Sequence, residues 1–319
     1  MSKSIGGYFE LELTPRGHFH KTAYRLGSAR NCFECILTAR RWRKVFLPYY
    51  SCNVILQPIE RLGIKYEFYH INASLDPVDF PVLMKDEAFL YTNYFGLKQA
   101  TVNLLADFYG NQLIIDNAQA FYSSWIDGID TFYSPRKFFG VPDGGYLYSD
   151  FLSVTELERD DSSWMRSTHL LRRIDQNPEM GYDDFRRAEE SLDNAPIRLM
   201  SKLSDTILAS VDYPFIALKR RQNYQLLKEV FADRNPVLQG ELGDEVPMVF
   251  PFLSNQGKRL RSALLSHHVY LARYWPNVQE WCSSGIESEY VDDLLPLPID
   301  QRLGIDEMNS IIEIIHKNE

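Results

Sequence analysis

Short apolar runs alternate with helix-like segments through the first half of this chain, and this alternation limits the folds open to it. The runs are rich in β-branched and aromatic residues and cover Lys44–Pro48, Lys65–Ile71, Ala88–Phe95, Gln112–Asp116, Asp130–Tyr133 and Gly145–Tyr148. The helix-like segments between several of them cover Arg30–Arg41, Cys52–Leu62 and Thr101–Tyr109. Strands that alternate with helices build a mainly parallel sheet flanked by helices. The sequence therefore predicts an α/β fold, whose ligands gather at the carboxyl ends of the strands.

The second half of the chain predicts a helical region followed by a smaller α+β part. Residues 150–213 are polar and helix-like and show no strand pattern. After them we predict a long helix over Arg220–Phe231, a strand over Val246–Phe252 and a closing amphipathic helix over Asp306–His316. The 319 residues suffice for one large domain and a smaller one. We expect a large domain over residues 1–217 and a small C-terminal domain over residues 218–319.

The charge balance and the distribution of apolar residues exclude two classes of partner. The chain has 34 Lys and Arg against 43 Asp and Glu, a net charge of −9, whereas a non-specific nucleic-acid binder needs a basic surface. No uninterrupted apolar stretch approaches the ~18 residues that suggest a membrane span, and the N-terminus lacks the apolar core of a signal peptide. We expect a cytoplasmic protein that binds neither nucleic acid nor membrane.

The cysteines give no metal-site pattern. Cys32 and Cys35 form a C-x-x-C, but no second Cys/His pair follows at zinc-ligand spacing, and Cys52 and Cys282 stand alone. The pair lies in a segment that reads as a buried helix, where Cys behaves as a small hydrophobic residue. We therefore expect no metal and a reducing compartment.

Lys137 and Asp116 are the strongest candidates for chemistry. Asp116 ends the strand-like run Leu113–Asp116, and Lys137 follows the next strand in a turn that also holds Ser134 and Gly140. This order suits a pyridoxal phosphate (PLP) site, because the Lys amine can form a Schiff base with the cofactor. The Asp carboxylate would keep the pyridine nitrogen protonated, so that the ring accepts electrons. The alternative for Asp116 is a loop residue that caps the next segment.

Two further segments fit the same site. Residues 26–31, Leu-Gly-Ser-Ala-Arg-Asn, combine small residues, a helix start and a cationic side chain, which together suit a phosphate group. The alternative is that Ser28 only caps this helix. Gln119 is placed to contact the phenolic oxygen of the PLP ring. The alternative is that Gln119 faces solvent. Residues 142–145, Pro-Asp-Gly-Gly, form a turn that keeps side-chain bulk out of the site.

Together these segments resemble the DegT/StrS-like sugar aminotransferases, a family of fold type I PLP enzymes. The resemblance extends over most of the chain and is carried by Leu26–Asn31, Phe46–Asn53, Tyr94–Gly96, Ile115–Gln119, Ser134–Lys137, Asp143–Gly145 and Leu295–Ile299. It implies a two-domain homodimer with active sites at the subunit interface and PLP as cofactor. It also implies amino transfer from a donor such as glutamate to a keto group of a nucleotide-linked sugar.

The resemblance also implies a role for individual residues. Lys137 would carry the Schiff base and then move the proton between substrate and cofactor. Asp116 would pair with the pyridine nitrogen, and Gln119 with the ring face or its oxygen. Phosphate contacts would come from Ser28, Ala29, Arg30 and Ser134.

The chain departs from the family pattern at several cofactor positions. Where many relatives stack an aromatic ring on the cofactor, this chain has Cys52, and Tyr49 or Tyr50 is positioned to substitute, so Tyr50 and Cys52 are expected cofactor contacts. Phe132 stands where relatives carry a Ser or Thr, five residues before the lysine. Arg30 is atypical in the phosphate loop and is positioned to replace the phosphate contact of that Ser or Thr.

These departures leave two alternatives to sugar amino transfer. One is a PLP enzyme that acts on another acceptor, and the other is a catalytically degenerate relative that binds PLP or a sugar nucleotide. Retention of Lys137 argues against the related dehydratases, which carry His at this position.

Overall fold

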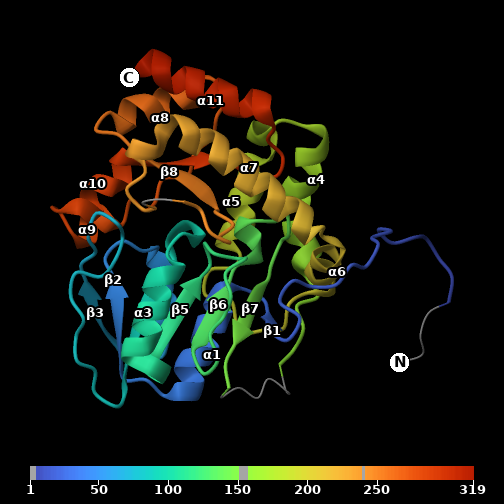
Figure 1. Cartoon of the computed structure of the whole chain (residues 1–319). Coiled ribbons are helices and arrows are strands. Elements are labelled where there is room, and N and C mark those ends of the chain that lie inside the picture. The colour runs from blue at the N-terminus through green and yellow to red at the C-terminus, as the bar shows by residue number, and fades with distance from the viewer. Residues whose placement is uncertain (1–4, 151–156, 239–240) are drawn as a thin grey trace.

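The computed structural model describes residues 5–150, 157–238 and 241–319 (Figure 1). Within these residues seven strands form one sheet in the order β1-β7-β6-β5-β4-β2-β3. Their bounds are Tyr24–Leu26 for β1, Lys44–Pro48 for β2, Lys65–Tyr69 for β3, Glu87–Thr92 for β4, Leu113–Asn117 for β5, Asp130–Tyr133 for β6 and Gly145–Tyr148 for β7. Strands β2 to β6 pair in parallel, and β7 is antiparallel to both β1 and β6. The predicted mainly parallel sheet is therefore confirmed.

Helices cover both faces of this sheet, so its central strands are buried on two sides. The helices of this part are α1 (Ala29–Arg40), α2 (Leu56–Arg61), α3 (Gln99–Tyr109), α4 (Thr168–Asp175), α5 (Tyr182–Glu190) and α6 (Lys202–Ser210). Along β4, Leu90 belongs to one apolar cluster with Phe33 of α1, whereas Phe89 belongs to a second cluster with Val102 of α3. Neighbouring residues of a strand point to opposite faces, which explains why these strands appear as continuous apolar runs in the sequence.

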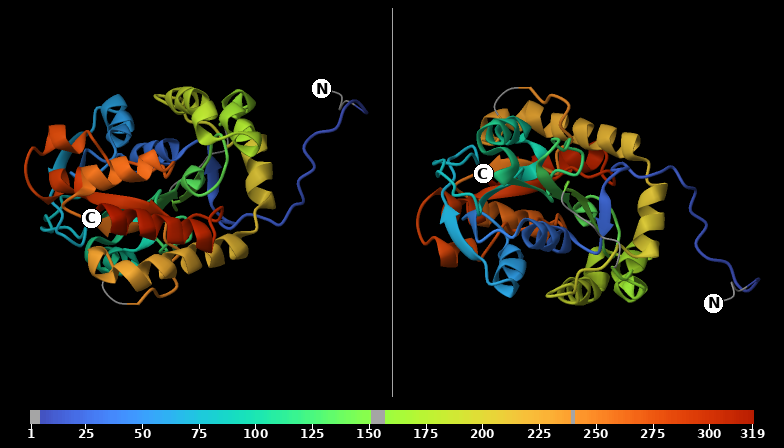
Figure 2. Two further views of the ribbon diagram at one scale, coloured as in Figure 1. Left: turned by 90° about the horizontal axis from the view of Figure 1, so that it is seen from above. Right: turned by 90° about the horizontal axis from the view of Figure 1, so that it is seen from below.

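A smaller C-terminal part, from α7 onward, lies at the carboxyl ends of the parallel strands. Its elements are α7 (Tyr213–Phe231), β8 (Val249–Leu253), α8 (Gly257–Ser266), α9 (Val278–Trp281), α10 (Ile286–Asp293), β9 (Leu294–Pro298) and α11 (Ile305–Asn318). Strands β8 and β9 form an antiparallel pair. In Figure 1 the arrows of β2 and β3 point toward this part, and Figure 2 shows the first described residues of the N-terminal segment extending away from the rest of the chain.

The structure differs from the sequence prediction at several element ends. Strand β1 was not predicted, because three residues are too few to show a period. Helix α7 begins at Tyr213 rather than Arg220, since the Asp212 side chain caps it by accepting from Phe215 N at 3.1 Å. The proposed boundary near residue 217 thus lies inside α7, and the division into residues 1–217 and 218–319 stays a prediction.

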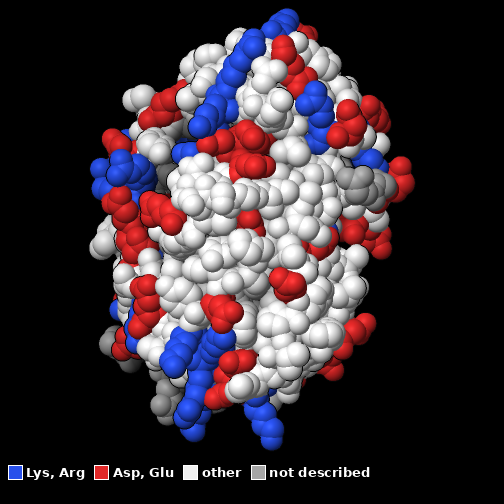
Figure 3. All heavy atoms as spheres, turned by 90° about the vertical axis from the view of Figure 1, so that its left-hand side faces the viewer, with Lys and Arg blue, Asp and Glu red and all other residues white. Residues whose placement is uncertain are grey.

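The surface is mixed in charge. On the face shown in Figure 3, acidic and basic side chains are interspersed around a broad uncharged band. No helix among the described residues is both long and apolar enough to cross a membrane.

Arg220 of α7 joins the C-terminal part to the loop after β6. It is 2% exposed, and its guanidinium donates to Met248 O at 2.9 Å and to Gln301 Oε1 at 3.2 Å. The same group lies over the ring of Phe138, 4.6 Å from the ring centre. A buried cation is tolerated only when its donors are paired in this way.

We expect Arg220→Met to lower the free energy of unfolding by about 2–4 kcal/mol, because the buried carbonyl of Met248 loses its donor. Urea unfolding followed by circular dichroism measures this change. Lys219→Met is the control, with an expected change within about 0.5 kcal/mol. Equal effects of the two substitutions would contradict the assigned role of Arg220.

Candidate active site

One cavity of about 350 Å³ brings together almost all the residues that the sequence nominated. It opens where β2, β4, β5 and β6 end. The predicted residues that line it are Ser28, Ala29, Arg30, Cys52, Asp116, Gln119, Ser134 and Lys137. Their convergence follows from the parallel pairing of the strands, which places the segments after each strand at one edge of the sheet.

Tyr50 is the nominated residue that does not line this cavity. Its side chain is fully buried, and its hydroxyl donates to Tyr290 O at 3.4 Å. Its ring packs edge-on against Trp275, with 5.1 Å between ring centres, and Trp275 does line the cavity. Tyr50 therefore supports a wall of the cavity instead of facing into it, because the turn after β2 directs it into the core between the two parts.

Asp116 lies at the end of β5, opposite Thr92 of the paired strand β4. Its Oδ1 accepts from Ala118 N at 2.8 Å. Burial raises the pKa of Asp116 to about 6, against the opposing effects of the Ala118 hydrogen bond and of the charge on Lys137. The carboxylate thus lacks a full complement of partners within the protein, and a cationic ligand would stabilise its ionised form.

Lys137 ends a short 3₁₀ turn, Pro135–Lys137, that begins directly after Ser134. Its side chain is exposed rather than buried in the apolar turn. The Nζ atom lies 5.7 Å from the centre of the Tyr274 ring. Lys137 also lines a second cavity of about 880 Å³, so its amine is reachable from two sides.

Gln119 offers a donor that no described residue satisfies. The side chain is 1% exposed, and its Oε1 accepts from Phe95 N at 3.1 Å, which fixes the orientation of the amide. Its buried Nε2 has no hydrogen-bond partner among the described residues. An unpaired buried donor costs about 1–3 kcal/mol, so an acceptor atom of a ligand in the cavity would stabilise this arrangement.

The start of α1 forms part of the cavity wall. Ser28 caps the helix by accepting from Asn31 N at 3.1 Å, as the alternative interpretation held, and it lines the cavity as well. A Cβ added to Gly145 would lie 2.5 Å from the carbonyl carbon of Ser28, so only glycine fits here. Gly144 N also donates to Gly27 O at 2.7 Å. The Gly-Gly turn therefore supports a helix start whose positive end faces the cavity.

Arginine–carboxylate pairs occupy the rim. Arg30 donates to Asp193 at 2.5 Å and to Gln57 at 2.9 Å, and Arg136 forms an ion pair with Glu189 of α5. Both acids line the cavity. In this structure the guanidinium of Arg30 is thus held by a protein carboxylate, which an incoming anion would have to replace.

Sequence reasoning missed several lining residues. Thr92 ends β4 in the same way that Asp116 ends β5, so the strand-end argument applied to it. Arg136 directly precedes Lys137 and was passed over in the same turn. Trp275 and Glu189 come from distant segments, and no local pattern in the sequence indicated them.

We expect Asp116→Asn to gain stability relative to the native protein as pH rises, when no ligand is present. Burial raises the pKa of Asp116 from 3.8 to about 6, so the stability of the native protein falls as pH increases from about 4 through about 6. The difference in unfolding free energy should shift toward the variant by about 2 kcal/mol between about pH 4.5 and about pH 7.5. Urea unfolding at about pH 4.5 and about pH 7.5 tests this. A difference that does not depend on pH would refute the assigned burial effect.

No protein-family model and no curated protein matches this sequence. Solved structures, however, match the fold over most of the chain. A DegT DnrJ EryC1 StrS aminotransferase from Brucella abortus matches with TM-score 0.60 and 16% identity over 92% of this chain and 85% of that one. S. venezuelae DesV, solved in complex with a ketimine intermediate, matches with TM-score 0.63 and 15% identity over 92% of this chain and 84% of that one.

An E. coli GDP-4-keto-6-deoxy-D-mannose-3-dehydratase with bound hydrated PLP matches with TM-score 0.61 and 16% identity, over 92% of this chain and 87% of that one. Aminotransferases and a dehydratase thus share this architecture, and at such identities the likeness establishes the fold. The chain has the fold of type I PLP-dependent enzymes and resembles the DegT/DnrJ/EryC1/StrS sugar aminotransferases in structure across most of its length.

Proposed function

We propose that this protein is a PLP-dependent aminotransferase that acts on a keto group of a nucleotide-linked sugar. The observation that carries the proposal is the shared cavity of Lys137, Asp116 and the start of α1. An amine, a carboxylate and a helix N-terminus suit the aldehyde, the ring nitrogen and the phosphate of PLP, respectively. The unpaired Nε2 of Gln119 adds a donor suited to the phenolic oxygen.

Each of these groups has a distinct task in this proposal. When bound, PLP supplies an aldehyde that condenses with amines and a ring that withdraws electrons. Lys137 Nζ would hold the cofactor and later transfer a proton at the substrate carbon that carries nitrogen. Asp116 would face the ring nitrogen, where its ionised form is favoured by an opposite charge. Ser28, Ala29 and Ser134 would position the phosphate.

The second cavity beside Lys137 supports a large anionic acceptor. Apolar side chains of α4 and of the turn after β6 line much of it. Arg136, Arg173 and Arg302 also line it beside Asp300, whereas the guanidinium of Arg220 is already paired with Met248 O and Gln301. Guanidinium groups suit the diphosphate of a nucleotide-linked sugar, and apolar walls suit its uncharged parts. The amino donor, such as glutamate, would share the Lys137 side of the site.

A degenerate relative is the second candidate, and one contact favours it. Arg30, at the proposed phosphate position, is already paired with Asp193. If this pair does not open, phosphate binding rests on the helix N-terminus and Ser134, without the charge of Arg30. The Lys137 experiment below separates the two candidates, because a degenerate relative would hold PLP without exchanging amino groups.

We also propose that the protein is a homodimer. Large apolar side chains remain exposed on the N-terminal segment and around α4, among them Tyr8, Phe9, Trp164 and Ile174. Exposed apolar groups on this scale are typical of surfaces that contact another chain.

We expect Lys137→Ala to lose covalent attachment of PLP and to slow amino transfer by at least about 100-fold. Borohydride reduction of the native protein with PLP, followed by peptide mass spectrometry, should find the added mass at Lys137. Lys85→Ala, which changes an exposed lysine, is the control and should behave like the native protein. Failure of the native protein to take up PLP would overturn the proposal, and uptake without reaction with any amino donor or acceptor would favour the degenerate candidate.

We expect Gly145→Ala to weaken PLP binding by at least about tenfold, equivalent to about 1.4 kcal/mol. The new methyl group must displace the backbone of Ser28, because its Cβ would lie 2.5 Å from that carbonyl. Gly140→Ala, in the segment before β7, is the control, since its Cβ meets only Leu170 Cδ2 at an ordinary 3.6 Å. Fluorescence titration with PLP measures both variants, and equal affinities would contradict the proposed phosphate position.

A further inference from the structure

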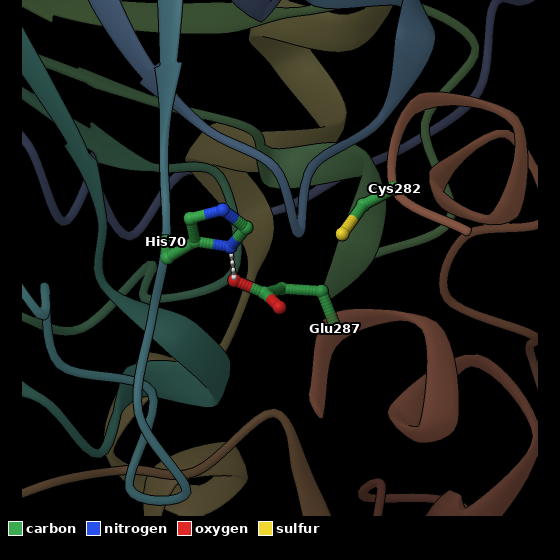
Figure 4. Close-up of side chains that lie close together, drawn as sticks. All are labelled: His70, Cys282 and Glu287. Carbon is green, nitrogen blue, oxygen red and sulfur yellow. Dashed lines mark hydrogen bonds and ion pairs between the residues drawn. The ribbon is translucent and has the colours of Figure 1, made fainter. Parts of the chain in front are cut away.

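We propose that His70, Cys282 and Glu287 form a binding site for a divalent transition metal ion, with Zn²⁺ as the best match. One ligand atom from each of these side chains lies within 4.8 Å of the other two. Figure 4 shows the three side chains converging from separate segments of the chain. None of them lines the cavity that holds Lys137, so this site is independent of the proposed function.

The three residues belong to both parts of the structure. His70 directly follows β3 of the large sheet. Cys282 directly follows α9, and Glu287 lies in the first turn of α10. His70 and Glu287 are 217 positions apart in the sequence, which is why spacing rules for zinc ligands did not detect them. Only the packing of the C-terminal part against β3 brings them together.

Glu287 is the residue whose surroundings point most directly to a cation. Its side chain is 2% exposed, although it is a carboxylate. Its Oε1 accepts from Ile71 N and from His70 Nδ1, each at 2.9 Å. Across residues 5–150, 157–238 and 241–319, no Lys or Arg forms an ion pair with Glu287. A buried carboxylate is costly without a compensating positive charge, and a metal ion would supply one.

The set of donor atoms suits Zn²⁺. Imidazole nitrogen, thiolate sulfur and carboxylate oxygen bind zinc at about 2.0–2.3 Å, which in a tetrahedron places the ligand atoms roughly 3.2–3.8 Å apart. Ligand atoms already within 4.8 Å of one another therefore need shifts of about 1 Å. His70 is half exposed, which leaves room for water as the fourth ligand.

Neighbouring groups hold these ligands in place. The ring of Tyr49 packs on the imidazole of His70, with 4.7 Å between ring centres. The Ile71 N–H fixes one oxygen of Glu287. Cys282 Sγ donates to Ser284 O at 2.8 Å and would give up this proton on binding the metal. Hydrogen-bonding and packing partners of this kind hold metal-binding side chains in the orientation that the metal ion requires.

A metal ion here would secure a wall of the candidate active site. The segment that carries Cys282 and Glu287 also carries Trp275, which lines the Lys137 cavity, and Asn277, whose Nδ2 donates to Ser51 O at 3.0 Å. Bonds from one ion to His70 on one side and to this segment on the other would join the C-terminal part to the large sheet. The ion thus has a structural role in this proposal.

Titration of the full-length, tag-free protein with Co²⁺, in the absence of PLP, tests the site. We expect one Co²⁺ per chain, with a thiolate-to-cobalt charge-transfer band and the visible bands of tetrahedral cobalt. Cys282→Ser should abolish the charge-transfer band, and His70→Gln should weaken binding. Cys52→Ser and Cys35→Ser are matched controls that should keep the spectrum, because these cysteines lie elsewhere. A missing band, or a band that survives Cys282→Ser, would overturn the proposal.

Competition between the protein and a chelating indicator for Zn²⁺ provides a second readout. We expect Cys282→Ser and Glu287→Gln each to lower the Zn²⁺ affinity by roughly 100-fold or more. Substituting a residue that only supports a metal ligand lowers the affinity less than this. Zn²⁺ should also raise the thermal midpoint of the native protein but not that of the variants, since binding only the folded state stabilises it. Equal midpoints with and without Zn²⁺ in the native protein would show that the site binds no metal and that His70 and Glu287 are joined only by their hydrogen bond.

Discussion

The parallel pairing of β5 with β6 is the interaction on which the candidate active site depends. In this register Asn117 lies opposite Tyr133, so the segments carrying Asp116 and Lys137 leave the sheet at the same edge. A slip by one residue would turn every side chain of the strand to the other face. The register is held because both faces are buried by apolar clusters. The packing of the core therefore sets the positions of Asp116 and Lys137 in the cavity.

Electrostatics within the cavity explain why the protein is suited to a ligand with charges of both signs. Burial raises the pKa of Asp116 to about 6 because its protein partners do not fully replace water. The start of α1, which lines the same cavity, offers a positive helix end. At the rim of the cavity Arg30 is paired with Asp193 and Arg136 with Glu189. An incoming anion can take the place of either carboxylate.

The C-terminal part completes the cavity, shares one apolar cluster with the large sheet and makes polar contacts with it as well. Tyr290 of α10 donates to Ala73 O at 2.8 Å, and Asn277 donates to Ser51 O at 3.0 Å. Arg220 adds a buried cation between α7 and the loop after β6. The proposed metal site lies at the same junction. Such contacts fix the position of Trp275, and through it the shape of the cavity.

The sequence by itself determined strands β2 to β7 of the large sheet and the order in which Asp116, Gln119 and Lys137 follow them. These features are local, because a period of two or a strand end can be recognised within a few residues. Only the tertiary structure decided that Tyr50 faces the core, that Arg30 meets Asp193, that Trp275 forms a cavity wall and that His70 meets Glu287. Each of these depends on which distant segment packs nearby, and a hydrophobic pattern specifies that a side chain is buried without specifying its partner.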